Sequence, residues 1–193
     1  PVAEPIKLAT IAANLALIAS GEATAANQGI YTETLVYVTY MWWGGIGCTM
    51  PLVLEMMFAA KSKKLKALGR ACIAPAIFNI NEPVVFGTIA WNPIMMLPMW
   101  IIGIVMPLLT WFGVKVIQFA PFNIMQFELW YCPYPIGTWI STGGSIAAII
   151  FVIIEFLVAA AIWFPFLKAY DQQCCNEEAE ADSKKSVTAK ATA

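Results

Sequence analysis

The chain has 193 residues, of which 60% are hydrophobic and only 12% are charged, and its mean hydropathy is +0.72. This composition excludes an ordinary soluble domain and is typical of an integral membrane protein. The net charge of −1 gives no indication of nucleic-acid binding. The sequence has no histidine and no C-x-x-C pair among its five cysteines, so we predict no metal site, no cofactor and no disulfide framework.

The N-terminal segment predicts one short helix. Pro5 favours a helix start, and residues 6–20 are apolar and alanine-rich up to Gly21. A helix of this length reaches about 22 Å, whereas the hydrocarbon core of a bilayer is about 30 Å thick. We therefore expect a half-membrane helix or the end of a longer element.

Three longer apolar stretches are candidate membrane segments. Residues 35–60 are long enough to span, but the run Gly44–Gly47 interrupts them, and either tight helix packing or a functional role would explain it. Residues 94–114 form either a full span or one arm of a hairpin followed by a short helix. Residues 146–167 form the last span, which carries only Glu155 as a charge, and we expect that residue to be structural.

The charges outside these stretches indicate orientation. Residues 61–70 carry five positive charges, and the positive-inside rule places this loop in the cytoplasm. From Asp171 onward the sequence is a low-complexity mixture of Glu, Ala, Lys and Ser that predicts a disordered cytoplasmic tail. The predicted organisation is a membrane-embedded domain over residues 1–170 and a tail over residues 171–193.

Residues 71–98 are apolar, yet they contain one carboxylate, Glu82, beside Asn79 and Asn81. A glycine and four prolines break any continuous helix here: Pro75, Pro83, Gly87, Pro93 and Pro98. An ionisable group at membrane depth usually faces a cavity or a pathway. Non-helical backbone at that depth is tolerated only where protein or a water-filled cavity covers it. We therefore predict a re-entrant hairpin that lines a polar binding site.

Residues 120–144 form a second irregular stretch. It is rich in aromatic residues, and prolines at 121, 133 and 135 exclude one regular helix. An ordinary loop is seldom this aromatic, so a second re-entrant or site-lining loop is a reasonable interpretation.

The polar and aromatic residues of these two stretches match the chemistry of a sugar site. Carboxylates and amides hydrogen-bond to hydroxyls, and Asn79, Asn81 and Glu82 provide them. Aromatic faces cover the apolar face of a sugar ring, and the candidates are Trp91, Trp130, Tyr131, Tyr134 and Trp139. The alternative for Glu82 is a structural carboxylate that caps a helix end, and the cost of a charge at this depth favours a functional role. No Ser/His/Asp set, phosphate loop or nucleotide motif is present.

The motif F-N-I-N-E-P-V-V-F-G-x-x-x-x-N-P at Phe78–Pro93 resembles that of the membrane-embedded enzyme IIC of the bacterial sugar phosphotransferase system, in its lactose/cellobiose/diacetylchitobiose branch. Further segments follow in the order that the family has. These are P-I-x-L-x-x-x-A-A-N at Pro5–Asn14, G-G-x-G-C-T at Gly44–Thr49, S-K-x-L-K-A-L-G at Ser62–Gly69, W-x-x-P at Trp130–Pro133, S-T-G-G at Ser141–Gly144 and W-F-P-F-L-K at Trp163–Lys168.

The resemblance implies a dimeric permease of the bacterial plasma membrane whose second half, the transport domain, holds a β-linked disaccharide between two re-entrant hairpins. Glu82 would bind the 6-hydroxyl that is phosphorylated, Asn81 would line the same site, and Trp130 would stack on a sugar ring. The phosphoryl group would come from a cysteine of a phosphorylated IIB protein at the cytoplasmic face. This chain lacks that phosphocysteine motif, so it resembles the permease half that works with an N-terminal half and a IIB partner.

The chain departs from the family pattern at several positions. The family's Ile-His-Gly segment would fall just before Pro1, Ile46 replaces a usual Thr, and Tyr131-Cys132 replace a usual pair of threonines. These differences leave the particular disaccharide open. Two alternatives also stay open: a proton-coupled secondary transporter with Glu82 as proton carrier, and a non-transporting remnant that only packs with partners.

Overall fold

The computed structural model describes residues 3–24, 27–28, 38–124 and 131–191. All regular structure in these ranges is helical, and no strand is found there, which confirms the all-α prediction for this part of the chain. The elements are α1 (Ala3–Ser20), α2 (Val38–Tyr40), α3 (Met50–Phe58), α4 (Lys63–Ile77), α5 (Glu82–Val84), the π-helix η2 (Val85–Ile89), α6 (Pro93–Trp111), the π-helix η3 (Phe112–Val116), α7 (Ile136–Ser141) and α8 (Ile146–Ala191).

Two helices of the described chain are long and apolar enough to cross a membrane. One is α6 with its continuation η3, which together run from Pro93 to Val116. Asn92 caps this helix, since its side-chain oxygen accepts a hydrogen bond from the Ile94 N–H at 3.1 Å, and Pro93 occupies the first turn, where no N–H is needed. The region 94–114 is therefore one continuous helical segment rather than a hairpin arm followed by a separate helix.

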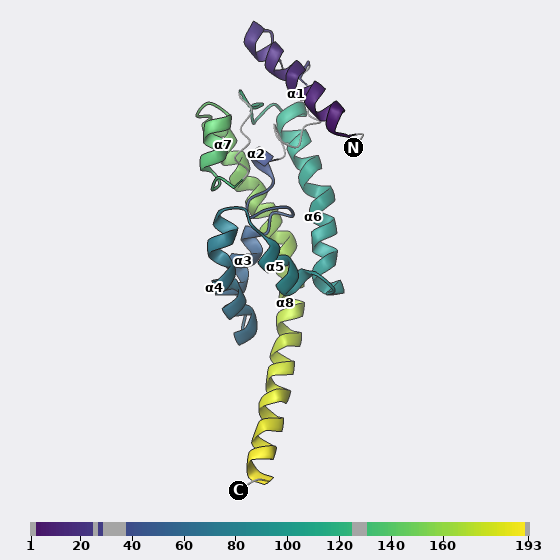
Figure 1. Ribbon diagram of the computed structural model, residues 1–193, viewed down its shortest axis with the longest axis vertical. Coiled ribbons are helices and arrows are strands. Elements are labelled where there is room, and N and C mark those ends of the chain that lie inside the picture. Colours follow the sequence, from purple (N-terminus) through teal and green to yellow (C-terminus); the bar gives the residue numbers. More distant parts are fainter. Residues whose placement is uncertain (1–2, 25–26, 29–37, 125–130, 192–193) are drawn as a thin grey trace.

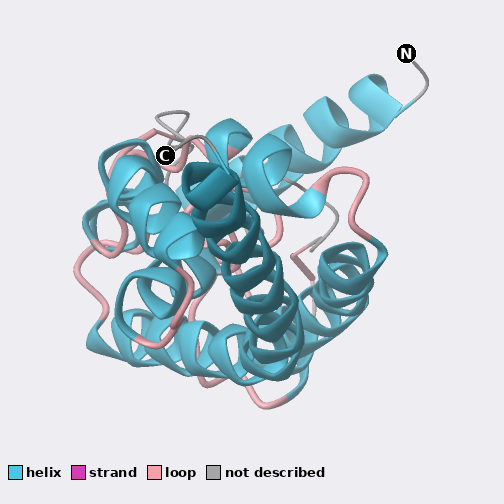
Figure 2. Ribbon diagram, turned by 90° about the horizontal axis from the view of Figure 1, so that it is seen from below, coloured by secondary structure: helices cyan, strands magenta, loops and turns pink. Residues whose placement is uncertain are grey.

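The second long helix is α8, which the other helices surround in the view from below (Figure 2). It continues to Ala191 and extends beyond the rest of the molecule (Figure 1). The disordered tail expected from Asp171 onward is thus replaced by helix. After Pro165 the sequence contains no further proline or glycine and is rich in Ala, Glu and Lys, which are strong helix formers.

The stretch 35–60 is not one spanning helix. A loop over residues 41–49, called the glycine loop below, separates α2 from α3. Gly44, Gly45 and Gly47 have φ values of 86°, 97° and 88°, a left-handed conformation that only glycine adopts without strain. The glycine run therefore prevents α2 and α3 from forming one continuous helix.

The chain reverses direction after α4, and α5 with η2 returns beside it as a helical hairpin (Figure 1). A Cβ atom at Gly87 of η2 would lie 2.8 Å from a methyl carbon of Leu68, so the two arms are in close contact. On its other side α4 packs on α3, where a Cβ at Gly69 would lie 3.0 Å from the backbone nitrogen of Met57. Small residues thus set the spacing of these helices.

Buried side chains from α3, α4, α5, α6 and α8 form the main core. Its largest members are Leu52, Met56, Leu65, Met95, Ile102, Met106, Trp163 and Leu167. A second cluster joins α2, η3, the loop after η3 and α8, and it includes Tyr40, Val114, Phe122, Tyr134 and Phe151. The glycine loop lies where these two cores meet, because Cys48 belongs to the first cluster and Trp43 packs against both.

Candidate functional site

The hairpin turn over Phe78–Asn81 carries the polar residues that the sequence singles out. Pro75 lies in the last turns of α4, and the N–H groups of Phe78 and Ile80 both donate to its carbonyl. Asn79 has φ = 60°, in the left-handed region that asparagine tolerates better than most residues. Glu82 then begins α5, followed by Pro83 in the first turn, where proline is favoured.

Asn79 ties the turn to two distant segments. Its side chain is only 6% exposed. Its amide oxygen accepts a hydrogen bond from the Gly44 N–H at 3.0 Å, and its amide nitrogen donates to the Cys132 carbonyl at 2.9 Å. One side chain therefore connects the glycine loop, the hairpin turn and the segment that precedes α7.

Asn81 makes a second connection to the glycine loop. Its amide nitrogen donates to the Ile46 carbonyl at 2.7 Å. The backbone of Gly45 approaches the same turn so closely that a Cβ there would lie 2.7 Å from the Asn81 side chain and 2.8 Å from the Asn79 carbonyl. The sequence left two explanations for the glycine run, and the structure shows that it permits close contact with the turn.

The glycine loop is in turn held by α8 and by its own side chains. The indole N–H of Trp163 points to the carbonyls of Gly47 and Cys48, at 3.3 and 3.2 Å. The Thr49 hydroxyl donates to the Gly44 carbonyl at 2.5 Å. Trp43 stacks on Tyr134 with ring centroids 6.1 Å apart and an angle of 12° between the planes. The loop thus forms a fixed wall beside the turn.

The predicted polar residues differ in what they do within this arrangement. Asn79 and Asn81 hold backbone groups of neighbouring segments. Glu82 is exposed, and no described residue gives its carboxylate a hydrogen bond or ion pair. A carboxylate with free acceptor sites next to a rigid turn is suited to accept hydrogen bonds from a ligand hydroxyl. Trp130 lies outside the described residues.

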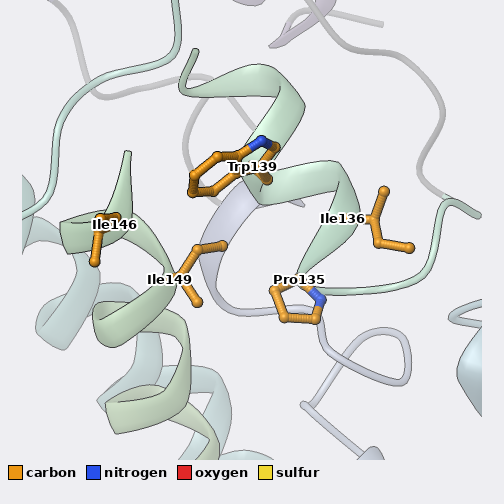
Figure 3. Close-up of a pocket in the computed structure, with 5 residues that line it drawn as sticks. All are labelled: Pro135, Ile136, Trp139, Ile146 and Ile149. Atoms are coloured by element: carbon orange, nitrogen blue, oxygen red, sulfur yellow. The ribbon is translucent and has the colours of Figure 1, made fainter. Parts of the chain in front are cut away.

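The remaining aromatic candidates lie in different surroundings. Tyr134 is buried against Trp43. Trp139 of α7 lines an open apolar pocket of about 340 Å³ together with Pro135, Ile136, Ile146 and Ile149. In Figure 3, Trp139 and Pro135 lie beside the two isoleucines of α8, whereas the side chain of Ile136 points away from them. Tyr131 is exposed.

Trp91 lies at the other end of the hairpin. It is 94% exposed in the turn between η2 and α6, and it lines a cavity of about 530 Å³ with Lys64 and Tyr170. Lys64 belongs to the first turn of α4, whereas Asn79 follows the last turn. Trp91 is therefore not brought together with Glu82.

The contacts of the two asparagines with the glycine loop were not evident from the sequence. Asn79 accepts a hydrogen bond from the Gly44 N–H, and Asn81 donates one to the Ile46 carbonyl. Side-chain patterns in a sequence do not indicate such contacts with backbone groups. Within the described residues no group of three or more Cys, Asp or Glu side chains is arranged to hold a metal ion.

The family model described as "Phosphotransferase system, EIIC" matches residues 1–103. The chain therefore belongs to the EIIC family of the phosphotransferase system. The relatives and the solved structure that it resembles place it in the lactose/cellobiose/diacetylchitobiose branch of that family.

Among curated relatives, the chain is 38% identical over 180 residues to the "PTS system lactose-specific EIICB component" of Lacticaseibacillus casei. This alignment covers 92% of this chain and 30% of the relative. It is also 38% identical over 150 residues to the "PTS system cellobiose-specific EIIC component" of Geobacillus stearothermophilus, covering 77% of this chain and 33% of the relative. The chain thus spans about a third of the length of these relatives.

A solved structure has the same fold. The crystal structure of the transporter ChbC, the IIC component from the N,N'-diacetylchitobiose-specific phosphotransferase system, superimposes with a TM-score of 0.82 at 31% sequence identity. The match covers 90% of this chain and 39% of the transporter.

Proposed function

We propose that this chain forms the sugar-binding part of a phosphotransferase-system permease that takes up a β-linked disaccharide of the cellobiose, lactose or diacetylchitobiose type. Membership of the EIIC family and the names of the relatives support this proposal. The observation that carries it is the exposed carboxylate of Glu82, which has no hydrogen-bond or ion-pair partner among the described residues and lies on a turn that Asn79 and Asn81 hold in place.

In this proposal the helical hairpin of α4, α5 and η2 is a re-entrant element of the bilayer, and the site lies at its turn. Glu82 accepts a hydrogen bond from the 6-hydroxyl of the sugar, because an ionised carboxylate is an acceptor only. Asn79 and Asn81 complete the polar wall, and Trp130 stacks on a sugar ring. An ionisable residue inside a membrane protein usually faces a cavity or a pathway and has a functional role.

The start of α4 and the extended part of α8 are proposed to be cytoplasmic. Residues 61–70 carry five positive charges, and the N–H groups of Lys61, Lys63 and Lys64 donate to carboxylates of this part of α8, so the positive-inside rule applies to both. A phosphorylated IIB protein would approach from this side. In the complete protein the chain would work with an N-terminal half as a homodimer.

The proposed phosphoryl transfer needs no metal or nucleotide in this chain. The 6-hydroxyl oxygen attacks the phosphorus of the IIB phosphocysteine, the new O–P bond forms as the S–P bond breaks, and the cysteine leaves as a thiolate. The hydroxyl proton passes to a base, and Glu82 is placed either to accept it or to orient the hydroxyl for its loss to water.

The test uses the complete gene product that contains this chain, reconstituted in proteoliposomes. Binding of cellobiose, lactose and diacetylchitobiose is measured first, and uptake is then followed with and without phosphorylated IIB. We expect saturable binding of one disaccharide without IIB and sugar 6-phosphate inside the vesicles only with it. Accumulation of unmodified sugar driven by a proton gradient would favour a secondary transporter, and binding of none of the three sugars would overturn the proposal.

A further inference from the structure

The extended part of α8 carries two carboxylates that reach the start of α4. Asp171 and Glu178 are seven residues apart, so two helical turns place them on the same face of α8. The carboxylate of Asp171 accepts hydrogen bonds from the N–H groups of Lys61, at 2.9 Å, and Ser62, at 2.8 Å. Asp171 is itself 3% exposed.

Glu178 makes similar contacts with the first turn of α4. Its carboxylate accepts hydrogen bonds from the Lys64 N–H at 2.9 Å, the Lys63 N–H at 3.2 Å and the Ser62 hydroxyl at 2.7 Å. The same Ser62 hydroxyl oxygen accepts from the Leu65 N–H at 3.2 Å, as an N-cap residue does. The N–H groups at the start of α4, which have no partner within the helix, are therefore bonded by a second helix.

The charges in this contact match the direction of the helix dipoles. Two anions of α8 lie at the N-terminus of α4, where negative charge is favourable. The ammonium group of Lys168 donates to the Ala59 carbonyl at 2.8 Å, at the C-terminus of α3, where positive charge is favourable. We call the contact of Asp171 and Glu178 with residues 61–64 the clamp.

The clamp and the candidate site lie at opposite ends of one helix. From Lys63 to Ile77, α4 is a single helix, and the turn with Asn79 follows its last residue. Between these two ends, α4 packs closely on α3 at Gly69. A shift of the start of α4 along its axis therefore moves the turn that carries Glu82.

We propose that Asp171 and Glu178 are positioning residues that fix α4, and with it Glu82, in the geometry that binds sugar. This inference rests on the proposed function and adds to it a role for the extended α8, outside the sugar site. The clamp sets the affinity of the site without contact with the ligand.

The first test measures disaccharide binding to the complete protein with Asp171→Asn, Glu178→Gln or both. Positioning predicts that the dissociation constant rises about fivefold or more in the double variant while the number of binding sites per protein is unchanged. A merely structural role predicts the reverse, with fewer competent sites of normal affinity. The matched control is Glu180→Gln, which removes the same charge from an exposed position on α8 and is expected to leave both quantities unchanged.

Because Asp171 is buried and its variant could fail to fold, Glu178→Gln alone is the milder test. We expect an intermediate rise in the dissociation constant from this variant. An unchanged dissociation constant in Glu178→Gln and in a folded Asp171→Asn protein would overturn the proposal.

A second measurement does not depend on sugar, and it separates failure of this inference from failure of the proposed function. Hydrogen exchange of backbone amides is compared between the unmodified protein and Glu178→Gln. We expect faster exchange at residues 63 and 64, whose N–H groups lose their charged acceptor, and also at residues 79–82 at the far end of α4. Faster exchange confined to residues 63 and 64 would show that the clamp is local and would overturn its positioning role, whether or not sugar binds.

Discussion

The side-chain nitrogen of Asn79 lies 2.9 Å from the backbone oxygen of Cys132, although 53 residues separate them in the chain. The same side chain accepts a hydrogen bond from Gly44, 35 residues away in the other direction. A buried amide with both of its ends bonded is costly to remove, because each lost partner leaves a backbone group unsatisfied. Asn79 therefore holds together the three segments that surround the turn before Glu82.

Replacement of Asn79 by alanine should lower the free energy of unfolding by about 2 kcal/mol, because the backbone groups of Gly44 and Cys132 lose their partner. Asn79→Gly should cost about 1 kcal/mol less, because glycine adopts the left-handed conformation of this position freely. Chemical or thermal unfolding of the protein in detergent measures both. Equal stability of the alanine variant and the unmodified protein would contradict the role assigned to the side chain.

Gly45→Ala should weaken sugar binding and reduce stability by about 2 kcal/mol. Its φ of 97° is unfavourable for alanine, and the added Cβ would meet Asn81 and the backbone oxygen of Asn79. Gly103→Ala in α6 is the matched control, since a Cβ there meets nothing within 4 Å, and we expect no loss of stability from it. A Gly45→Ala protein with normal sugar affinity would show that the glycine loop does not shape the site.

Thr110→Val should loosen the contact between α6 and α8. The Thr110 hydroxyl donates to a carboxylate oxygen of the fully buried Glu155 at 2.5 Å, and the expected cost of losing this bond inside a membrane is about 1 kcal/mol. Thr110→Ser keeps the hydroxyl and should retain most of the stability. Unfolding midpoints measure the difference, and indistinguishable valine and serine variants would argue against a structural role for Glu155.

The helical continuation of α8 predicts slow hydrogen exchange over residues 169–180. Helical amides bonded within α8 and packed on the start of α4 are protected, whereas a disordered tail exchanges at the rate of a free peptide. If the amides of residues 169–180 exchange at the rate of a free peptide, this segment is disordered, as its composition alone suggests.

Local sequence signals predicted the helical class and the position of the turn. Prolines, glycines and two asparagines beside a carboxylate in an apolar stretch were enough to locate Asn79, Asn81 and Glu82 in one place. These signals act over a few residues, so a single sequence contains them in full. The family resemblance carried by the same motif is confirmed by the family model and the relatives.

These local signals did not predict contacts between distant segments. The break of residues 35–60 into α2, loop and α3 depends on how the glycine loop meets the hairpin turn, and that partner is not evident from the glycines themselves. The tail was assigned as disordered from composition, yet the spacing of Lys168, Asp171 and Glu178 places all three on one helical face. That periodicity was the available signal, and it was outweighed by the low complexity of the segment.

The most direct test of the account is the dissociation constant of the preferred disaccharide for the complete protein with Glu82 intact and with Glu82→Gln. Glu22→Gln, at an exposed position in the loop after α1, is the control for loss of one negative charge. If the sugar binds at the hairpin turn, affinity falls at least tenfold (about 1.4 kcal/mol) in Glu82→Gln and stays unchanged in Glu22→Gln. Equal affinity of the Glu82→Gln and unmodified proteins would contradict the placement of the sugar at the hairpin turn.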